Sequence, residues 1–119
     1  MRVFSFILFI VLSSCAEQGN IQDFKVGRFK TYLEEADVTS IAERNEFIQI
    51  ETHEGVKDTF DITWESNFEY TLKHKNPKTA LDSIPFSVRI TGIKKKSYTF
   101  TAQFKGSNFK QKGWVEKLD

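Results

Sequence analysis

The 119-residue chain has a single cysteine, Cys15, which excludes a framework of disulfide bonds within the chain. It has only two prolines and six glycines, which is unlike a disordered Pro/Gly-rich segment. Neither sign of charge is in excess, since 17 Lys and Arg oppose 16 Asp and Glu, so nothing in the composition favours a nucleic-acid partner. Long hydrophobic runs are also absent. The ten residues 3–12 would cover roughly 15 Å as a helix, against about 30 Å of bilayer hydrocarbon.

Aromatic residues are abundant, with twelve Phe, three Tyr and two Trp, as is typical of a folded sheet protein. The chain after its opening segment has the length of one ordinary domain. We therefore expect a single domain with one modest core.

The first fifteen residues have the layout of a secretory signal: the basic residue Arg2, the apolar stretch 3–12, and small residues before Cys15. The ending "LSSC" resembles the lipobox of bacterial lipoproteins. This resemblance implies that the Cys15 thiol receives a diacylglyceryl group and becomes the mature N-terminus, held to a membrane by its acyl chains. The alternative is an ordinary secreted protein with a cysteine near its cleavage site. We expect a signal peptide at 1–14, a lipidated tether at 15–23 and a β-barrel-like domain at 24–119.

The residue after the cysteine is Ala16 rather than Asp, the residue that retains lipoproteins at the inner membrane in well-studied Gram-negative sorting. We therefore expect a protein of the cell envelope, held by its lipid, with the outer membrane favoured. The sequence leaves open whether the domain faces the periplasm or the exterior.

From residue 24 onwards, apolar and polar residues alternate with period two, and turn residues recur every eight to twelve positions. The pattern predicts eight antiparallel strands in an all-β, up-and-down meander that curls into a small barrel or clam. The connection 75–84 contains Asn76-Pro77 and room for one helical turn. The predicted strands cover residues 24–34, 37–44, 46–53, 57–64, 67–74, 85–94, 97–104 and 109–118.

The segment "VGRFK" after a short leader, the ladder of hairpins and the ending "SYTFTAQFKGSNFKQKGWVEKL" resemble the small lipocalin-like lipoproteins of Bacteroidetes-type bacteria. Relatives of this kind sometimes carry an automatic "DNA topoisomerase IV" label. We do not expect that activity, because the chain is far too short for a strand-passing enzyme and carries an export signal. The resemblance implies a lipocalin-like barrel, although this chain is shorter than typical lipocalins.

An eight-stranded barrel can be filled by its own side chains or can hold one small ligand. Two interpretations stay open for the inward aromatic residues: a plain core, or the lining of an apolar cavity. Tyr70 and Trp64 are the best candidates for a polar group inside a cavity, because a buried O–H or N–H needs a partner. The candidate lining residues are Phe60, Trp64, Phe68, Tyr70, Phe100 and Phe104.

Lys94, Lys95 and Lys96 concentrate at a predicted hairpin tip, where they could contact an anionic surface or simply remain solvated. Three further lysines, Lys105, Lys110 and Lys112, are expected to extend this basic end.

The sequence does not indicate a metal site or a catalytic site. His53 and Glu51 share one strand face, but no third ligand stands at metal-site spacing, so we expect no metal and no other cofactor. No serine lies in a Gly-x-Ser-x-Gly elbow. Phe104-Lys105 and Phe109-Lys110 superficially suggest a platform for single-stranded nucleic acid, which the export signal argues against.

The resulting hypothesis is a lipid-anchored, non-catalytic module that binds a small apolar ligand, an envelope lipid or glycan, or a protein partner. The alternative is a structural or inhibitory module with a filled core, and an enzyme is a further alternative.

Overall fold

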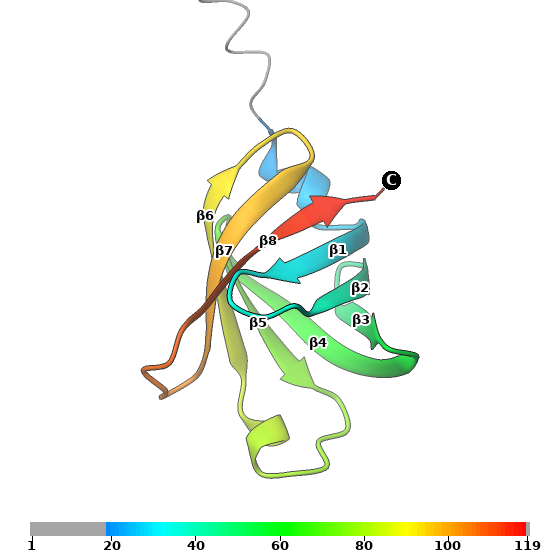
Figure 1. The fold of residues 1–119 in the computed structure, drawn as a ribbon, viewed down its shortest axis with the longest axis vertical. Coiled ribbons are helices and arrows are strands. Elements are labelled where there is room, and N and C mark those ends of the chain that lie inside the picture. Colours follow the sequence, from blue (N-terminus) through cyan, green and yellow to red (C-terminus); the bar gives the residue numbers. More distant parts are fainter. Residues whose placement is uncertain (1–18, 119) are drawn as a thin grey trace, which may run out of the picture.

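The computed structural model describes residues 19–118, which form an all-β barrel preceded by one short helical turn (Figure 1). Eight antiparallel strands follow one another in a meander, as predicted, and a second helical turn lies within the 75–84 connection. The elements are η1 (Ile21–Phe24), β1 (Gly27–Leu33), β2 (Thr39–Arg44), β3 (Ile48–His53), β4 (Val56–Ser66), β5 (Glu69–His74), η2 (Leu81–Ser83), β6 (Phe86–Ile93), β7 (Ser97–Phe104) and β8 (Gln111–Lys117).

The barrel is closed because the first strand pairs with the last. β1 pairs with β8 from Phe29 opposite Lys117 to Leu33 opposite Gly113. Every other strand pairs with its sequence neighbours, so none of the eight strands has a free edge. Gly113 permits this closure, since a Cβ at this position would overlap the carbonyl oxygen of Tyr32 and the ring of Phe100. Of the two predicted shapes, the closed barrel is the one that forms.

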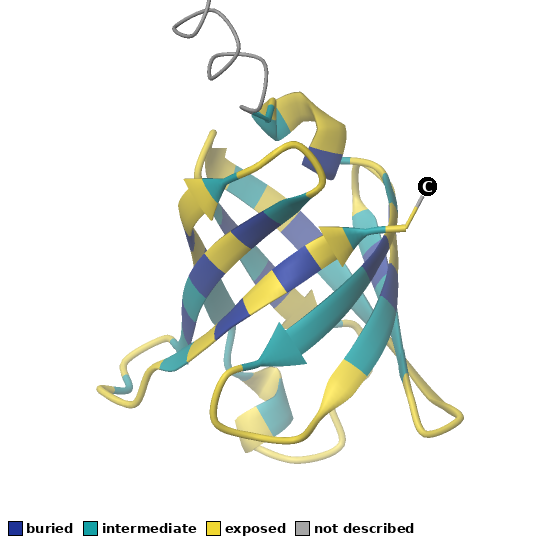
Figure 2. Cartoon of the chain, turned by 45° about the horizontal axis from the view of Figure 1, so that its top comes forward, coloured by how far each residue is buried: buried dark blue, intermediate teal, exposed yellow. Residues whose placement is uncertain are grey.

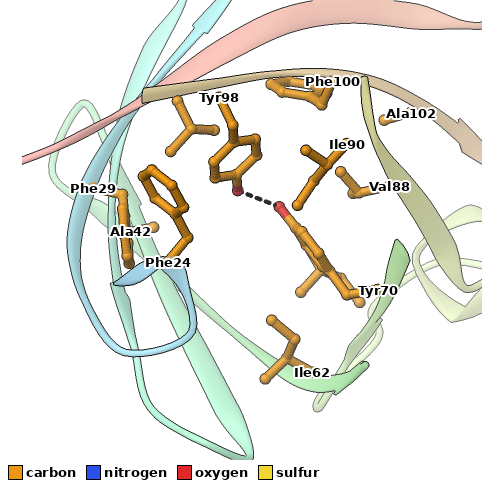
Figure 3. Packing of buried hydrophobic residues seen from close by; sticks show 12 residues of the cluster. Phe24, Phe29, Ala42, Ile62, Tyr70, Val88, Ile90, Tyr98, Phe100 and Ala102 are labelled. Carbon is orange, nitrogen blue, oxygen red and sulfur yellow. Dashed lines mark hydrogen bonds between the residues drawn. The ribbon is translucent and has the colours of Figure 1, made fainter. Parts of the chain in front are cut away.

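Burial alternates along the strands, as expected for a barrel with a packed interior (Figure 2). The inward side chains of β5, β6 and β7 supply much of the core, which gathers inside the strand wall (Figure 3). The buried apolar residues are Phe24, Phe29, Ala42, Ile62, Tyr70, Leu72, Val88, Ile90, Tyr98, Phe100, Ala102 and Val115.

The wall formed by β2 and β3 turns polar side chains inward. Arg44 and Gln49 are buried, whereas Ile48 and Ile50 on the opposite face are only partly buried. Glu51 shares the inward face of Gln49, since side chains two residues apart along a strand point the same way. The barrel interior therefore has a polar side as well as an apolar one.

The first predicted strand, 24–34, begins too early. Phe24 belongs to the helical turn η1, and β1 begins at Gly27. Asn20 caps this turn through a bond from the backbone N–H of Gln22 to its side-chain oxygen, and the chain enters β1 at Gly27 with a positive φ of 137°. Phe24 is consequently placed over one mouth of the barrel, where it is fully buried. Helical turn η1 closes that end, which we call the plugged end (Figure 1).

The two ends of the barrel follow from strand direction. The turns 45–47, 67–68 and 94–96 lie at the plugged end, together with the end of β8. The connections 34–38, 54–55, 75–85 and 105–110 lie at the opposite end, which we call the open end. Helical turn η2 belongs to this open end (Figure 1).

Candidate functional site

Arg44 is the most unusual residue of the interior, being a charged side chain with only 4 % of its surface exposed. Its Nε donates to Oε1 of Gln49 at 2.8 Å, and its Nη1 donates to the carbonyl oxygen of Phe24 at 2.7 Å. Its Nη2 donates to the hydroxyls of Tyr98 at 3.1 Å and Tyr70 at 3.3 Å. Every nitrogen of the guanidinium thus has a partner, as a buried charge requires.

The surroundings of Arg44 favour its charged form. Burial acts to lower the pKa of Arg44, but the adjacent Tyr98 and Tyr70 outweigh it, so the net shift is upward. The guanidinium also lies over the rings of Phe29 and Tyr70, 4.6 and 4.9 Å from their centroids. Burial raises the pKa of Tyr70 well above its ordinary value, so this hydroxyl stays neutral. The cluster is a cation surrounded by neutral oxygen atoms.

The tyrosine hydroxyls complete this network. The hydroxyl oxygens of Tyr70 and Tyr98 are 2.8 Å apart, and the two side chains point toward each other from β5 and β7, the strands on either side of β6 (Figure 3). The Phe24 ring packs edge-on against Tyr98 with centroids 5.2 Å apart. Arg44 therefore holds η1 in place through the Phe24 carbonyl, while the Phe24 side chain packs onto the same cluster.

Two lysines add contacts at the plugged end. Lys117 Nζ donates to the carbonyl oxygen of Asp23 at 2.6 Å, and Lys25 Nζ lies 5.1 Å from the centre of the Trp64 ring. Trp64 packs against Tyr70 with ring centroids 4.8 Å apart. Its buried Nε1 has no hydrogen-bond partner among the residues described. Of the two residues expected to bring a polar group inside, only Tyr70 has that group satisfied.

The open end of the barrel contains a pocket of about 400 Å³ within the strand wall. Five of its ten lining residues are apolar, three of them phenylalanines, and the rings of Phe86 and Phe104 meet edge-on with centroids 5.1 Å apart. Other hollows of the described surface lie outside the wall or at the plugged end. The lining residues are Glu51, Asp58, Phe60, Leu72, His74, Asp82, Ile84, Phe86, Phe104 and Gln111.

Three carboxyl groups, one histidine and the amide of Gln111 supply the polar part of this lining. Glu51 accepts a long hydrogen bond, 3.4 Å, from the Ser40 hydroxyl. Burial raises the pKa of Glu51, against the opposing influence of Arg44. His74 Nε2 lies 3.2 Å from Oδ1 of Asp58, and its Nδ1 accepts from the backbone N–H of Asn76 at 3.2 Å. Nδ1 therefore carries no proton in this arrangement, and Nε2–H donates to Asp58.

The six residues predicted to line a cavity lie in different parts of the structure. Phe60 and Phe104 line the pocket, while Tyr70 and Phe100 are buried in the core behind it. Trp64 lies near the plugged end. The prediction is wrong for Phe68, which is 51 % exposed because it falls in the two-residue turn between β4 and β5.

The lysines are divided between the two ends. Lys94, Lys95 and Lys96 form the β6–β7 hairpin tip at the plugged end. The expectation that Lys105, Lys110 and Lys112 extend this basic end is wrong: β7 carries the chain to the open end before these residues occur. Eight strand residues at about 3.3 Å each separate the two groups by roughly 26 Å.

His53 does not join Glu51 in a site. Its Nδ1 contacts the carbonyl oxygen of Thr39 at 2.7 Å on the surface, whereas Glu51 points into the barrel. Within residues 19–118, no group of three or more His, Cys, Asp or Glu side chains is arranged to hold a metal ion. Cys15 lies outside the described residues, as do the signal peptide and the first part of the tether.

Comparison with protein-family models, with curated proteins and with solved structures finds no match to this chain. In the described part of the chain, no helix has the length and apolar character needed to cross a bilayer.

Sequence reasoning missed Arg44 and the carboxyl groups of the pocket. The signal was present in the alternation of β2, where Arg44 shares a face with the small residue Ala42. Ala42 is fully buried, so the face of β2 that carries Ala42 points inward. Arg44 lies on the same face and therefore points inward as well. Period-two alternation identifies a shared face, but a lone alanine is weak evidence that the face is the buried one.

We predict that Arg44→Met lowers the free energy of unfolding by about 3–5 kcal/mol, because the Phe24 carbonyl and the two tyrosine hydroxyls lose a buried charged donor. Guanidinium denaturation of the purified protein measures this loss. Arg89→Met is the control, since Arg89 is exposed and its contact with Glu69 is 3.8 Å long. Equal stability of the two variants would contradict the role given to Arg44.

We predict that Glu51→Gln stabilises the protein increasingly as the pH rises from 4 to 8. The raised pKa of Glu51 means that the folded protein binds its proton more tightly than the unfolded chain, so wild-type stability is lost as the pH rises through that pKa. Glutamine removes this dependence, while Arg44, Asp58, Ser40 and Gln49 remain around the site. Thermal unfolding across this pH range measures the difference.

The matched control is Glu43→Gln, which removes a carboxylate from the exposed outer face of β2. A stability difference between wild type and Glu51→Gln that shrinks with rising pH would contradict the prediction.

Proposed function

We propose that this chain is a lipid-anchored protein of the cell envelope whose barrel binds a small apolar molecule without transforming it. The pocket at the open end is the observation that carries this proposal. Its volume of about 400 Å³ lies within the range of small-molecule sites, and aromatic and aliphatic side chains with a few convergent polar groups make up its wall.

The filled part of the barrel supports a binding role for the pocket. The Arg44 cluster and the core residues around Tyr98 occupy the interior towards the plugged end, so a ligand entering from the open end meets a closed floor. A structural or inhibitory module with a filled core is the second candidate. If the pocket holds only water, the filled interior around Arg44 and Tyr98 favours this second candidate.

The pocket chemistry supports binding rather than catalysis. No Ser, Thr, Cys or Lys lines the pocket, so hydroxyl, thiol and amine nucleophiles are missing from this part of the described structure. Both ring nitrogens of His74 are already engaged, one with Asp58 and one with the Asn76 backbone, which leaves neither free to take a proton from a ligand.

The proposed anchor is consistent with the end from which the described chain departs. Gly19 lies against the β6–β7 hairpin, since a side chain there would overlap the Lys94 carbonyl group. Gly19 is four residues along the chain from Cys15, a reach of at most about 14 Å. A lipid on Cys15, resembling that of the small lipocalin-like lipoproteins, would keep the plugged end and Lys94, Lys95 and Lys96 near the membrane. The pocket would then open away from it, with the outer membrane favoured because Ala16 follows the cysteine.

We expect the neutral, polarity-sensitive dye prodan to bind with a blue-shifted emission, and Phe86→Ala to weaken that binding about tenfold. Loss of roughly 50 Å² of apolar contact at about 25 cal/mol per Å² accounts for this factor. Fluorescence titration below the unfolding transition of each variant measures it. Phe109→Ala is the control, because Phe109 is 66 % exposed and lies outside the pocket. Absence of saturable binding would favour the filled structural module.

We expect cells fed radioactive palmitate to label the wild-type protein and to leave Cys15→Ala unlabelled, because the thiol is the only cysteine sulfur in the chain. The label is read on the immunoprecipitated protein. Cell fractionation follows the same two variants, with wild type in the membrane fraction. Equal labelling of both, or a freely soluble wild-type protein, would contradict the anchor while leaving the pocket proposal intact.

A further inference from the structure

We propose that the natural ligand of the open-end pocket is an amine, with a protonated nitrogen carried on an apolar body. This inference rests on the proposed binding function and specifies the chemical class of its ligand. It comes from the charges of the pocket lining and from their position opposite the aromatic wall.

The charges of the pocket lining have one sign. Glu51, Asp58 and Asp82 contribute carboxyl groups, and the lining contains no Lys or Arg. Arg44 directs its hydrogen bonds to Gln49, the Phe24 carbonyl and the two tyrosines, and reaches Glu51 only through its charge. Three carboxyl groups against this one cation leave an excess of acidic groups at the pocket, which would attract a cationic ligand and repel a carboxylate ligand.

Glu51 and Asp58 form the centre of this charge. They are directly opposite each other in the pairing of β3 with β4, and both line the pocket. Directly opposed residues have Cβ atoms about 4.5–5.5 Å apart, and two like charges at that spacing destabilise a sheet. Glu51 has the Ser40 hydroxyl and the Gln49 side chain as hydrogen-bond partners, and Asp58 has the His74 imidazole. The permanent cation that acts on the pair is Arg44, whose guanidinium donates its hydrogen bonds to other groups. A ligand ammonium group between the two carboxylates would relieve the repulsion.

The opposite side of the pocket provides the apolar surface. Phe86 on β6 and Phe104 on β7 face the interior, and in the closed ring of strands β7 lies across from β3. Leu72 on β5 extends this surface, and Phe60 on β4 adds an aromatic side chain on the same strand as Asp58. A ligand would thus place its nitrogen on the β3–β4 wall and its hydrocarbon or aromatic body against β6 and β7. The face of an aromatic ring attracts a cation, so one ligand can place its ammonium group at the carboxylates and its apolar body against the phenylalanines.

The test uses three naphthalene probes of nearly the same shape: 2-naphthylmethylamine, which is protonated at pH 7, neutral 2-naphthylmethanol and anionic 2-naphthoate. Isothermal titration calorimetry on the intact protein gives each affinity. We expect the amine to bind at least tenfold more tightly than the alcohol and the naphthoate to bind most weakly.

The variant Glu51→Gln/Asp58→Asn removes both opposed charges while keeping side-chain size. We expect it to reduce the preference for the amine over the alcohol to less than threefold. Far-UV circular dichroism and thermal unfolding of the variant verify that it is folded. Glu43→Gln, on the outer face of β2, is the matched control and should retain the full preference. The wild-type probe series tests the proposal even if the double variant does not fold.

The outcomes separate this inference from the proposed function. Equal affinity of the wild type for amine and alcohol would overturn the amine assignment and leave the apolar pocket standing. Persistence of the preference in the double variant would also overturn it, because the charge would then lie elsewhere. Failure of all three probes to bind would overturn both the amine assignment and the proposed binding function.

Discussion

The guanidinium of Arg44 is the interaction on which the organisation of this barrel depends. It connects η1 through the Phe24 carbonyl, β3 through Gln49, and the far side of the barrel through Tyr70 and Tyr98. A buried cation is costly unless its donors are satisfied, so these elements must be in place together. The same bonds position the N-terminal turn over one mouth of the barrel. They thereby determine which end is closed and which end can admit a ligand.

The interior consequently changes character along the barrel axis. A positive charge among neutral oxygens lies near the plugged end, apolar side chains fill the middle, and carboxyl groups face a pocket at the open end. The carboxyl groups of Glu51, Asp58 and Asp82 are thus gathered at the end of the interior opposite to η1. This arrangement gives the pocket a defined polarity.

Several features of this architecture could be predicted from the sequence, because they depend on local patterning. Period-two alternation and turn residues identified all eight strands and their order. Closure could not be derived in the same way, since the pairing of β1 with β8 joins residues that are far apart in the chain. Phe24 fits a strand pattern equally well, and only its packing over the mouth distinguishes the helical turn. A lone phenylalanine in a hairpin turn, such as Phe68, likewise resembles a core residue until the turn is located.

The candidate site was predictable only on its apolar side. Phe60 and Phe104 carry inward aromatic surface that alternation reveals. Glu51 and Asp58 look like ordinary solvated carboxylates in the sequence. Asp58 shares the face of Phe60, but a carboxylate near a strand end is usually solvated, and the face of Glu51 carries only polar neighbours, Gln49 and His53. Their significance arises from the register of β3 with β4, which is a property of the assembled sheet.

Pairing of the first strand with the last also has a consequence for how the molecule is made. Contacts between distant segments form slowly, because a long loop must close before they are gained. β1 is the first strand of the barrel and its partner β8 is the last. One edge of β1 therefore stays unpaired until the rest of the barrel has formed, which exposes it to association with other chains. Maturation of this barrel is thus most vulnerable just before its seam closes.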